Sequence, residues 1–206
     1  MRNVKPGGAV SLLIACLALA AACSPAPAAG NQTAGGANPT CFKRSSEAIG
    51  GPFQLTSADG KAVTEADFKG RKALVFFGYT YCPDVCPVTL FNLGKAMDSV
   101  PADKRPTTLF VSVDPERDTP EKLTQYIASN GFPKDIIGLT GTPEQLTGIT
   151  QAFKTQYGRD EAAGASGYLV SHSSILYLMD KDWKLQTFFM EGESPAEIAS
   201  CLSALD

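Results

Sequence analysis

The sequence has few residues of the kind that bind nucleic acids, and it holds only one histidine. Its 18 lysine and arginine residues are outnumbered by 21 aspartate and glutamate residues, which gives a formal net charge of -3. An acidic balance offers no electrostatic attraction to a phosphate backbone, so nucleic acid is excluded as an expected partner. No internal repeat or coiled-coil heptad interrupts the chain. Since 44% of the residues are apolar, one ordinary globular core is expected.

A hydrophobic run long enough to cross a membrane is also lacking. The longest apolar stretch extends from Ala9 to Ala22, whereas a spanning helix needs ~20 residues. Because Arg2 and Lys5 precede it and small residues end it, the stretch is typical of an export signal. We interpret residues 1–22 as a signal peptide of lipoprotein type, in which Cys23 becomes the lipidated N-terminus.

Ordinary signal cleavage nearby, or an uncleaved apolar anchor, are the alternatives to lipidation of Cys23. All of them export the chain, and lipidation would hold it on the periplasmic side of a bacterial membrane. Residues 23–40 consist mainly of alanine, proline, glycine and small polar residues, which predicts a flexible tether. The folded domain is therefore expected over residues 41–206.

Export gives the six cysteines a meaning, because unpaired thiols are uncommon in an oxidising compartment unless they have a role. Cys41 opens the domain and Cys201 lies in its last helical pattern. A structural disulfide between them would close a long loop and add about 4–5 kcal/mol in the chain-entropy model. The alternative is that one or both are buried as small apolar residues.

Apolar periodicity and turn signals predict alternating strands and helices. In chain order they are a hairpin (53–63), a buried strand (73–79), a helix (88–100), a buried strand (108–114), a helix (119–131), a short strand (136–141), a helix (142–157), a mobile loop (158–170), a hairpin (172–180 and 183–191) and a last helix from 194. This order predicts an α/β sandwich of thioredoxin type: a central mixed sheet flanked by helices, with an N-terminal β-hairpin.

Thr80–Pro87, TYCPDVCP, follows the first buried strand at the edge where such sheets hold their sites. Proline disfavours helix in the residue before it, so the helix is expected to begin at Pro87 with Cys86 as N-cap. The helix N-terminus would then stabilise a Cys86 thiolate. Cys82 and Cys86 could form a structural disulfide, a redox pair or two ligands of a metal.

The single histidine, His172, helps to distinguish these three roles of the cysteines. It is expected at the start of the penultimate strand, beside the cysteine loop, although a lone histidine is ordinarily a satisfied core or surface residue. Two thiolates and one imidazole form a soft ligand set suited to Cu(I), and an added oxygen could complete a Cu(II) site. Structural zinc normally has four protein ligands.

Three segments resemble the Sco/SenC family of copper chaperones: GYTYCPDVCP (78–87), VDPERDTPEKL (113–123) and SHSSILYLMD (171–180). The resemblance covers about residues 47–206. It implies a thioredoxin fold in which Cys82, Cys86 and His172 bind one copper ion, as Cu(I) or Cu(II). It also implies delivery of that copper, or reduction of target cysteines, during assembly of the binuclear copper centre of cytochrome c oxidase subunit II.

The remaining matched residues carry weaker expectations. Asp84 is carried over as a residue near the metal or an oxygen ligand. Helix capping and a rigid turn explain most of the segment that matches the family's DPxRDTP pattern, namely Asp114, Pro115, Arg117, Asp118 and Pro120. Ser171 departs from the family, which commonly has aspartate before its histidine, where a carboxylate could orient the imidazole.

Two functions are therefore expected from the sequence. The favoured one is a metallochaperone, which is not an enzyme and needs a copper donor, a thiol reductant and a copper-receiving protein. The alternative is an extracytoplasmic thiol–disulfide oxidoreductase in which Cys82 and Cys86 are the catalytic redox pair. His172 favours the first, because thiol exchange needs no imidazole ligand.

Overall fold

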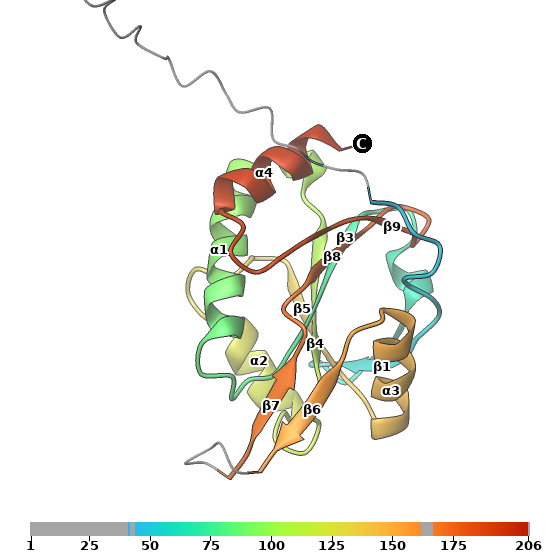
Figure 1. The fold of residues 1–206 in the computed structure, drawn as a ribbon, viewed down its shortest axis with the longest axis vertical. Helices are drawn as coiled ribbons and strands as arrows, with labels where there is room; N and C mark the ends of the chain where they lie inside the picture. Colours follow the sequence, from blue (N-terminus) through green and yellow to red (C-terminus); the bar gives the residue numbers. More distant parts are fainter. Residues whose placement is uncertain (1–40, 42–43, 162–166, 206) are drawn as a thin grey trace, which may run out of the picture. The chain divides into compact units, whose positions relative to one another are not determined.

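The computed structural model describes residue 41, residues 44–161 and residues 167–205 (Figure 1). The expected signal peptide, the tether and the lipidation site Cys23 lie outside the described residues. Within them, a central mixed sheet is covered by helices on both faces, which confirms the predicted α/β sandwich (Figure 1). No helix of the described residues is both long and apolar enough to span a membrane.

The central sheet has seven strands in the order β2-β1-β5-β4-β3-β8-β9. The strands are β1 (Gln54–Ser57), β2 (Ala62–Thr64), β3 (Ala73–Gly78), β4 (Thr107–Ser112), β5 (Ile136–Thr140), β8 (Leu176–Met179) and β9 (Leu185–Phe189). β3, β4 and β5 are parallel, and the antiparallel pairs β1–β2 and β8–β9 lie at the two edges. Every residue of β3 is buried, as its apolar sequence predicts for an inner strand.

Four α-helices surround the sheet: α1 (Val85–Ser99), α2 (Pro120–Ile127), α3 (Pro143–Ala152) and α4 (Pro195–Ala204). The last three begin as the sequence predicts. Thr119, Thr142 and Ser194 are N-caps whose hydroxyls accept a backbone N–H, and each is followed by proline at N1. α2 and α3 end four to five residues earlier than predicted.

Two hydrophobic clusters fix the sheet between its helices. β3 contributes to both, since Leu74 and Phe76 pack with α1, α2 and α4, while Val75 and Phe77 pack with α3. This alternation follows from the pleat, which sends successive side chains to opposite faces. β3 is thereby held rigidly, and the cysteine loop follows its last residue.

The predicted mobile loop over 158–170 is wrong at both of its ends. β6 (Tyr157–Asp160) and β7 (Leu169–His172) pair antiparallel as a separate two-stranded sheet, visible below the main sheet in Figure 1. The strands are short and every residue of β6 is exposed, so the sequence has no alternating apolar pattern that would predict β6. His172 accordingly ends β7 and does not begin β8.

The two ends of the domain are joined covalently. Cys41 and Cys201 form a disulfide with their Cα atoms 5.0 Å apart and 160 positions of sequence between them. Cys201 is buried on α4, in the cluster that α4 shares with α1. The bond therefore attaches the start of the domain to its last helix.

Candidate metal centre

Cys82, Cys86 and His172 come together at the carboxyl end of β3. One ligand atom from each, the two Sγ atoms and an imidazole nitrogen, lies within 4.8 Å of the others. Cys82 is half-buried in the loop after β3, Cys86 is fully buried in the first turn of α1, and His172 ends β7. Three segments that are distant in sequence thus supply one group of soft donor atoms.

The loop that carries Cys82 is anchored at its base by a buried carboxylate. Asp118 accepts hydrogen bonds from the backbone N–H of Thr80 (2.9 Å), from the Thr80 hydroxyl (2.6 Å) and from the Ser112 hydroxyl (2.6 Å). The Cys82 N–H then donates to the Tyr79 carbonyl at 3.2 Å. These bonds fix the turn in which Cys82 leaves the strand.

The predicted start of the following helix is wrong by two residues. α1 begins at Val85 with Asp84 as N-cap, so Cys86 is already the second residue of the helix and Pro87 is the third. Proline is tolerated there because the first-turn N–H groups have no partner within the helix. The Cys86 N–H donates to Cys82 Sγ at 3.4 Å, so the helix N-terminus faces the Cys82 sulfur.

The sequence led us to expect the thiolate at Cys86, but the structure favours it at Cys82. A hydrogen bond from the Cys86 thiol is the main cause that lowers the pKa of Cys82, to about 4, with smaller contributions from His172 and from the backbone N–H groups of Cys86 and Asp84. The same hydrogen bond and burial raise the pKa of Cys86. The two sulfurs thus share one proton and titrate as a pair.

His172 is oriented with its Nε2 atom toward the sulfurs. Its Nδ1 lies 3.3 Å from the Ser173 carbonyl oxygen, which can only accept, so Nδ1 carries the proton. Nε2 lies 3.2 Å from Cys86 Sγ, so the ring is directed at the two sulfurs. The rings of Phe76 and Tyr79 meet the imidazole edge to face, at 6.1 and 5.8 Å between centroids.

Ser171 does not take the orienting role that an aspartate could have in its position. Its hydroxyl donates to the Gly158 carbonyl of β6 at 3.1 Å, away from the imidazole. The Ser173 backbone carbonyl supplies the acceptor that fixes the tautomer instead. Asp84, the other residue expected near the metal, is exposed as the N-cap of α1, and it is not part of the three-residue group.

The segment between β4 and α2 supports the site and contributes no ligand from among the described residues. Thr119 is the N-cap of α2, which leaves the Asp118 carboxylate to Thr80 and Ser112. Asp114 forms an ion pair with Arg117, and its other oxygen accepts the Tyr168 hydroxyl at 2.7 Å. Sequence reasoning offered Asp118 or Thr119 as the N-cap of this helix. It did not find the bonds of Asp118 to Thr80 and Ser112, since these depend on the folded sheet.

Tyr168 connects this segment to the two-stranded sheet. The guanidinium groups of Arg117 and Arg159 both lie 3.6 Å from the centroid of its ring. Arg117 also donates to the Tyr168 carbonyl at 2.9 Å, and Arg159 forms an ion pair with Glu116. We call Asp114, Arg117, Arg159 and Tyr168 the arginine–tyrosine clamp. The clamp holds the far end of β7, the strand that carries His172.

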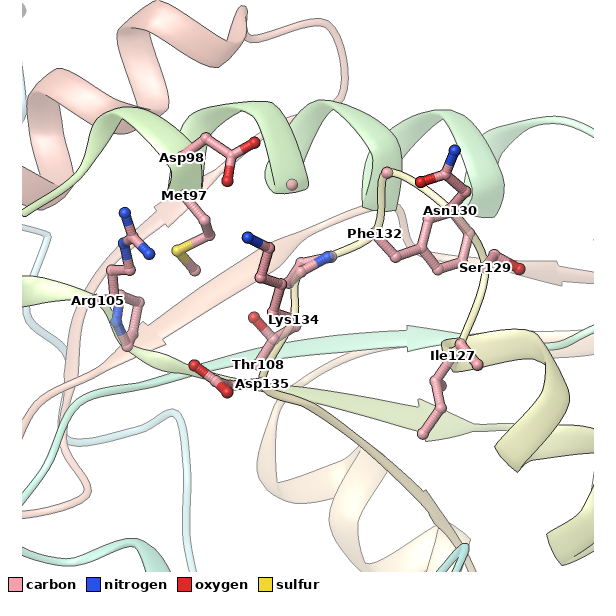
Figure 2. Close-up of a pocket in the computed structure, with 15 residues that line it drawn as sticks. Met97, Asp98, Arg105, Thr108, Ile127, Ser129, Asn130, Phe132, Lys134 and Asp135 are labelled. Atoms are coloured by element: carbon pink, nitrogen blue, oxygen red, sulfur yellow. The ribbon is translucent and has the colours of Figure 1, made fainter. Parts of the chain in front are cut away.

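A separate pocket of the structure contains none of the three candidate ligands. The pocket in Figure 2, of about 420 Å³, lies between α1 and the segment after α2, with Met97, Arg105 and Lys134 among its lining residues. Neither the two free cysteines nor the histidine lines it. Within the described residues, the metal-binding donor atoms therefore lie at the end of β3 and not in this pocket.

The donor set determines what the site can hold. Two thiolates and one imidazole suit a soft ion such as Cu(I). The group contains three ligands among the described residues, one fewer than a structural zinc site uses. Cys82 and Cys86 can also form a disulfide with one another, because the CxxxC loop places their two sulfur atoms close together.

Comparison with known proteins identifies the relatives of the chain. The model of the SCO1/SenC family matches residues 43–205. The protein SCO1 homolog 1, mitochondrial, of Arabidopsis thaliana is 39% identical over 144 residues, which are 69% of this chain and 42% of that protein. Protein SenC of Rhodobacter capsulatus is 39% identical over 152 residues, 73% of this chain and 67% of the relative.

Solved structures agree with the sequence matches. Bradyrhizobium japonicum ScoI with copper bound has a TM-score of 0.67 and 38% identity, and the match covers 75% of this chain and 98% of that one. The chain spans about half the length of the mitochondrial relatives that it matches.

Proposed function

The chain belongs to the SCO1/SenC family, and we propose that it is a copper metallochaperone that binds one copper ion through Cys82, Cys86 and His172. The observation that carries the proposal is the convergence of the two Sγ atoms and the histidine nitrogen within 4.8 Å. Copper is the cargo of this site, and the copper-bound ScoI structure supports the choice of ion. The fold, the donor types and the family all favour the same cargo.

The site is suited to hold copper and to release it. Cys82 already carries the thiolate, so of the two sulfurs only Cys86 has a proton to lose when the ion binds, and His172 presents its Nε2 atom beside them. Among the described residues the group offers three ligands, which would leave room for a further donor on the ion. A thiolate of a receiving protein can enter there before the cysteines of this chain let go.

We propose that the receiving protein is cytochrome c oxidase subunit II and that the copper serves its binuclear centre. The chain would act outside the cytoplasm, anchored by lipid at Cys23, supplied by a copper donor and kept reduced by a thiol reductant. A test mixes the Cu(I)-loaded chain with the reduced soluble domain of subunit II. Transfer predicts loss of copper from this chain and gain by the acceptor; retention of copper would reject the role.

Thiol–disulfide exchange is the second candidate, and the lowered pKa of Cys82 favours it. A reductase would oxidise Cys82 and Cys86 to a disulfide while one disulfide of the target becomes two thiols. The same mixture separates the two functions. Reduction of an oxidised acceptor by the metal-free chain, equally fast with His172→Ala, would support exchange as an activity independent of copper.

A further inference from the structure

Strand β7 has one edge that the rest of the described fold does not pair. In its ladder with β6, His172 lies opposite Tyr157 and Ser171 opposite Gly158. The next residues along the ladder are Ser173 and Gln156. The Ser173 N–H donates to the Gln156 carbonyl at 3.0 Å, so Ser173 and Gln156 form a hydrogen-bonded pair. Hydrogen-bonded pairs alternate with non-bonded ones, so Ser171 also directs its backbone groups to β6, and its two neighbours do not.

Val170 and His172 therefore direct their backbone groups to the opposite edge of β7. The Val170 N–H confirms this direction, because it donates to the Tyr79 hydroxyl at 3.3 Å, outside the two-stranded sheet. Within the described residues, no hydrogen bond occupies the Val170 carbonyl or the His172 backbone N–H and carbonyl. We call these three groups the outer edge of β7. Unpaired strand groups of this kind are a template for another strand.

The outer edge of β7 faces a pocket that opens beside the metal ligands. The pocket has a volume of about 330 Å³. One side is lined by Cys82–Val85, and the other by Leu169–His172. A chain segment in this pocket would therefore lie between the cysteine loop and β7, in contact with two of the three ligands.

The charge at this pocket has one sign. Asp84 and Asp160 both line it, and no lysine or arginine does so among the described residues. A segment that carries lysine or arginine next to its pairing residues would be attracted, and an acidic segment would be repelled.

From these observations we infer that the outer edge of β7 docks an extended, basic segment of the copper-exchange partner by β-strand pairing. Main-chain hydrogen bonds give such pairing its affinity, and side chains beside the strand give it selectivity. The segment would bring partner thiolates alongside Cys82. This inference rests on the proposed function for the identity of the partner, but the docking edge itself exists without copper.

The test uses the full chain, reduced, free of metal and labelled with ¹⁵N. The probe is a blocked peptide of alternating valine and threonine with a lysine at each end, which has no thiol. We expect saturable shifts of the amide signals of Cys82, Asp84, Val85 and His172. A matched peptide, N-methylated at alternate backbone amides, should bind at least about tenfold more weakly, since it lacks the donors that a strand needs.

Two pairs of protein variants test the charge. Asp84→Asn with Asp160→Asn should weaken binding about three- to tenfold at low salt, and the loss should shrink at high salt. Asp98→Asn with Asp135→Asn removes the same charge from the pocket of Figure 2 and should leave binding unchanged. Equal weakening by both pairs would mean that general charge, and not this pocket, attracts the peptide.

The inference is overturned if the N-methylated peptide binds as well as its parent, or if the shifts map to the exposed Val88 and Phe91 on α1 instead. His172→Ala keeps the backbone of β7 and should still bind the peptide. Cu(I) titration of the same preparations distinguishes the two proposals. Copper binding without peptide binding contradicts the docking edge alone, whereas peptide binding without copper binding contradicts the metallochaperone alone.

Discussion

The Nε2 atom of His172 lies 3.2 Å from Cys86 Sγ, although 86 positions of sequence separate the two residues. The contact exists because β7 passes the carboxyl end of β3, where α1 begins. Since the hydrogen bond to Cys82 and burial raise the pKa of the Cys86 thiol, this sulfur has to lose a proton before it binds a metal. Binding and protonation are therefore coupled at this centre.

The first prediction concerns that proton. At neutral pH the reduced chain should release about one proton for each Cu(I) that it binds, because the Cys86 pKa is raised while Cys82 is already a thiolate. Isothermal calorimetry in two buffers of different ionisation enthalpy measures the number. Release of about two protons would show that Cys82 holds its own proton, contrary to the geometry of the thiol pair.

The second prediction concerns stability and pH. The pKa of Cys82 is lowered to about 4, so between that pH and the ordinary thiol value near 8.5 the unfolded chain binds a proton that the folded chain does not. Stability from this group therefore rises with pH across the window and is lost as the pH falls toward 4. Urea unfolding of the reduced, metal-free chain from pH 5 to pH 8 should show the rise.

Cys82→Ser is the control for this prediction, because it removes the titrating group and keeps the size of the side chain similar. The difference in unfolding free energy between the two proteins should grow with pH. Parallel curves would mean that the Cys82 pKa is not lowered.

Most of the scaffold could be predicted from the sequence, because its strands are buried on both faces. ALVFFG carries no alternation and few residues other than apolar ones, so β3 could be read directly. The start of α1 could not be predicted from the sequence. Two prolines favoured Pro87, but the helix begins at Val85, since a proline in the first turn loses no hydrogen bond.

The strand that carries His172 was harder to predict for a different reason. β6 and β7 pair with one another, are four residues long and bury little, so neither has a pattern that differs from a loop. The three candidate ligands could still be named, because chemistry restricts them to the two cysteines of one loop and the only histidine. Their mutual geometry came from the fold alone.

The third prediction concerns the arginine–tyrosine clamp. Tyr168→Phe removes the hydroxyl that donates to Asp114 and should destabilise the domain by about 1–3 kcal/mol, because the buried carboxylate loses a partner. Hydrogen exchange of the β7 amides should accelerate more than exchange in β3. Tyr157→Phe, on exposed β6, is the matched control and should change neither quantity. Uniform acceleration in both strands would argue against a local clamp.

The fourth prediction concerns the disulfide between Cys41 and Cys201. The double substitution to alanine should lower the free energy of unfolding by about 2–4 kcal/mol, since a long loop is no longer closed in the unfolded chain. Copper affinity should not change, because α4 lies at the opposite end of the sheet from β7 (Figure 1). A large loss of copper affinity in this variant would show that the disulfide acts on the site.

The central claim is that Cys82, Cys86 and His172 form one copper site. It is tested most directly by titrating the reduced full chain with Cu(I) against a chromophoric competitor, beside His172→Ala and Cys82→Ser with Cys86→Ser. We predict one tight equivalent in the natural chain, none in the double cysteine variant, and at least about a hundredfold weaker binding without the imidazole. Cu(I) affinity indifferent to His172 would contradict the account and leave the cysteines as a redox pair.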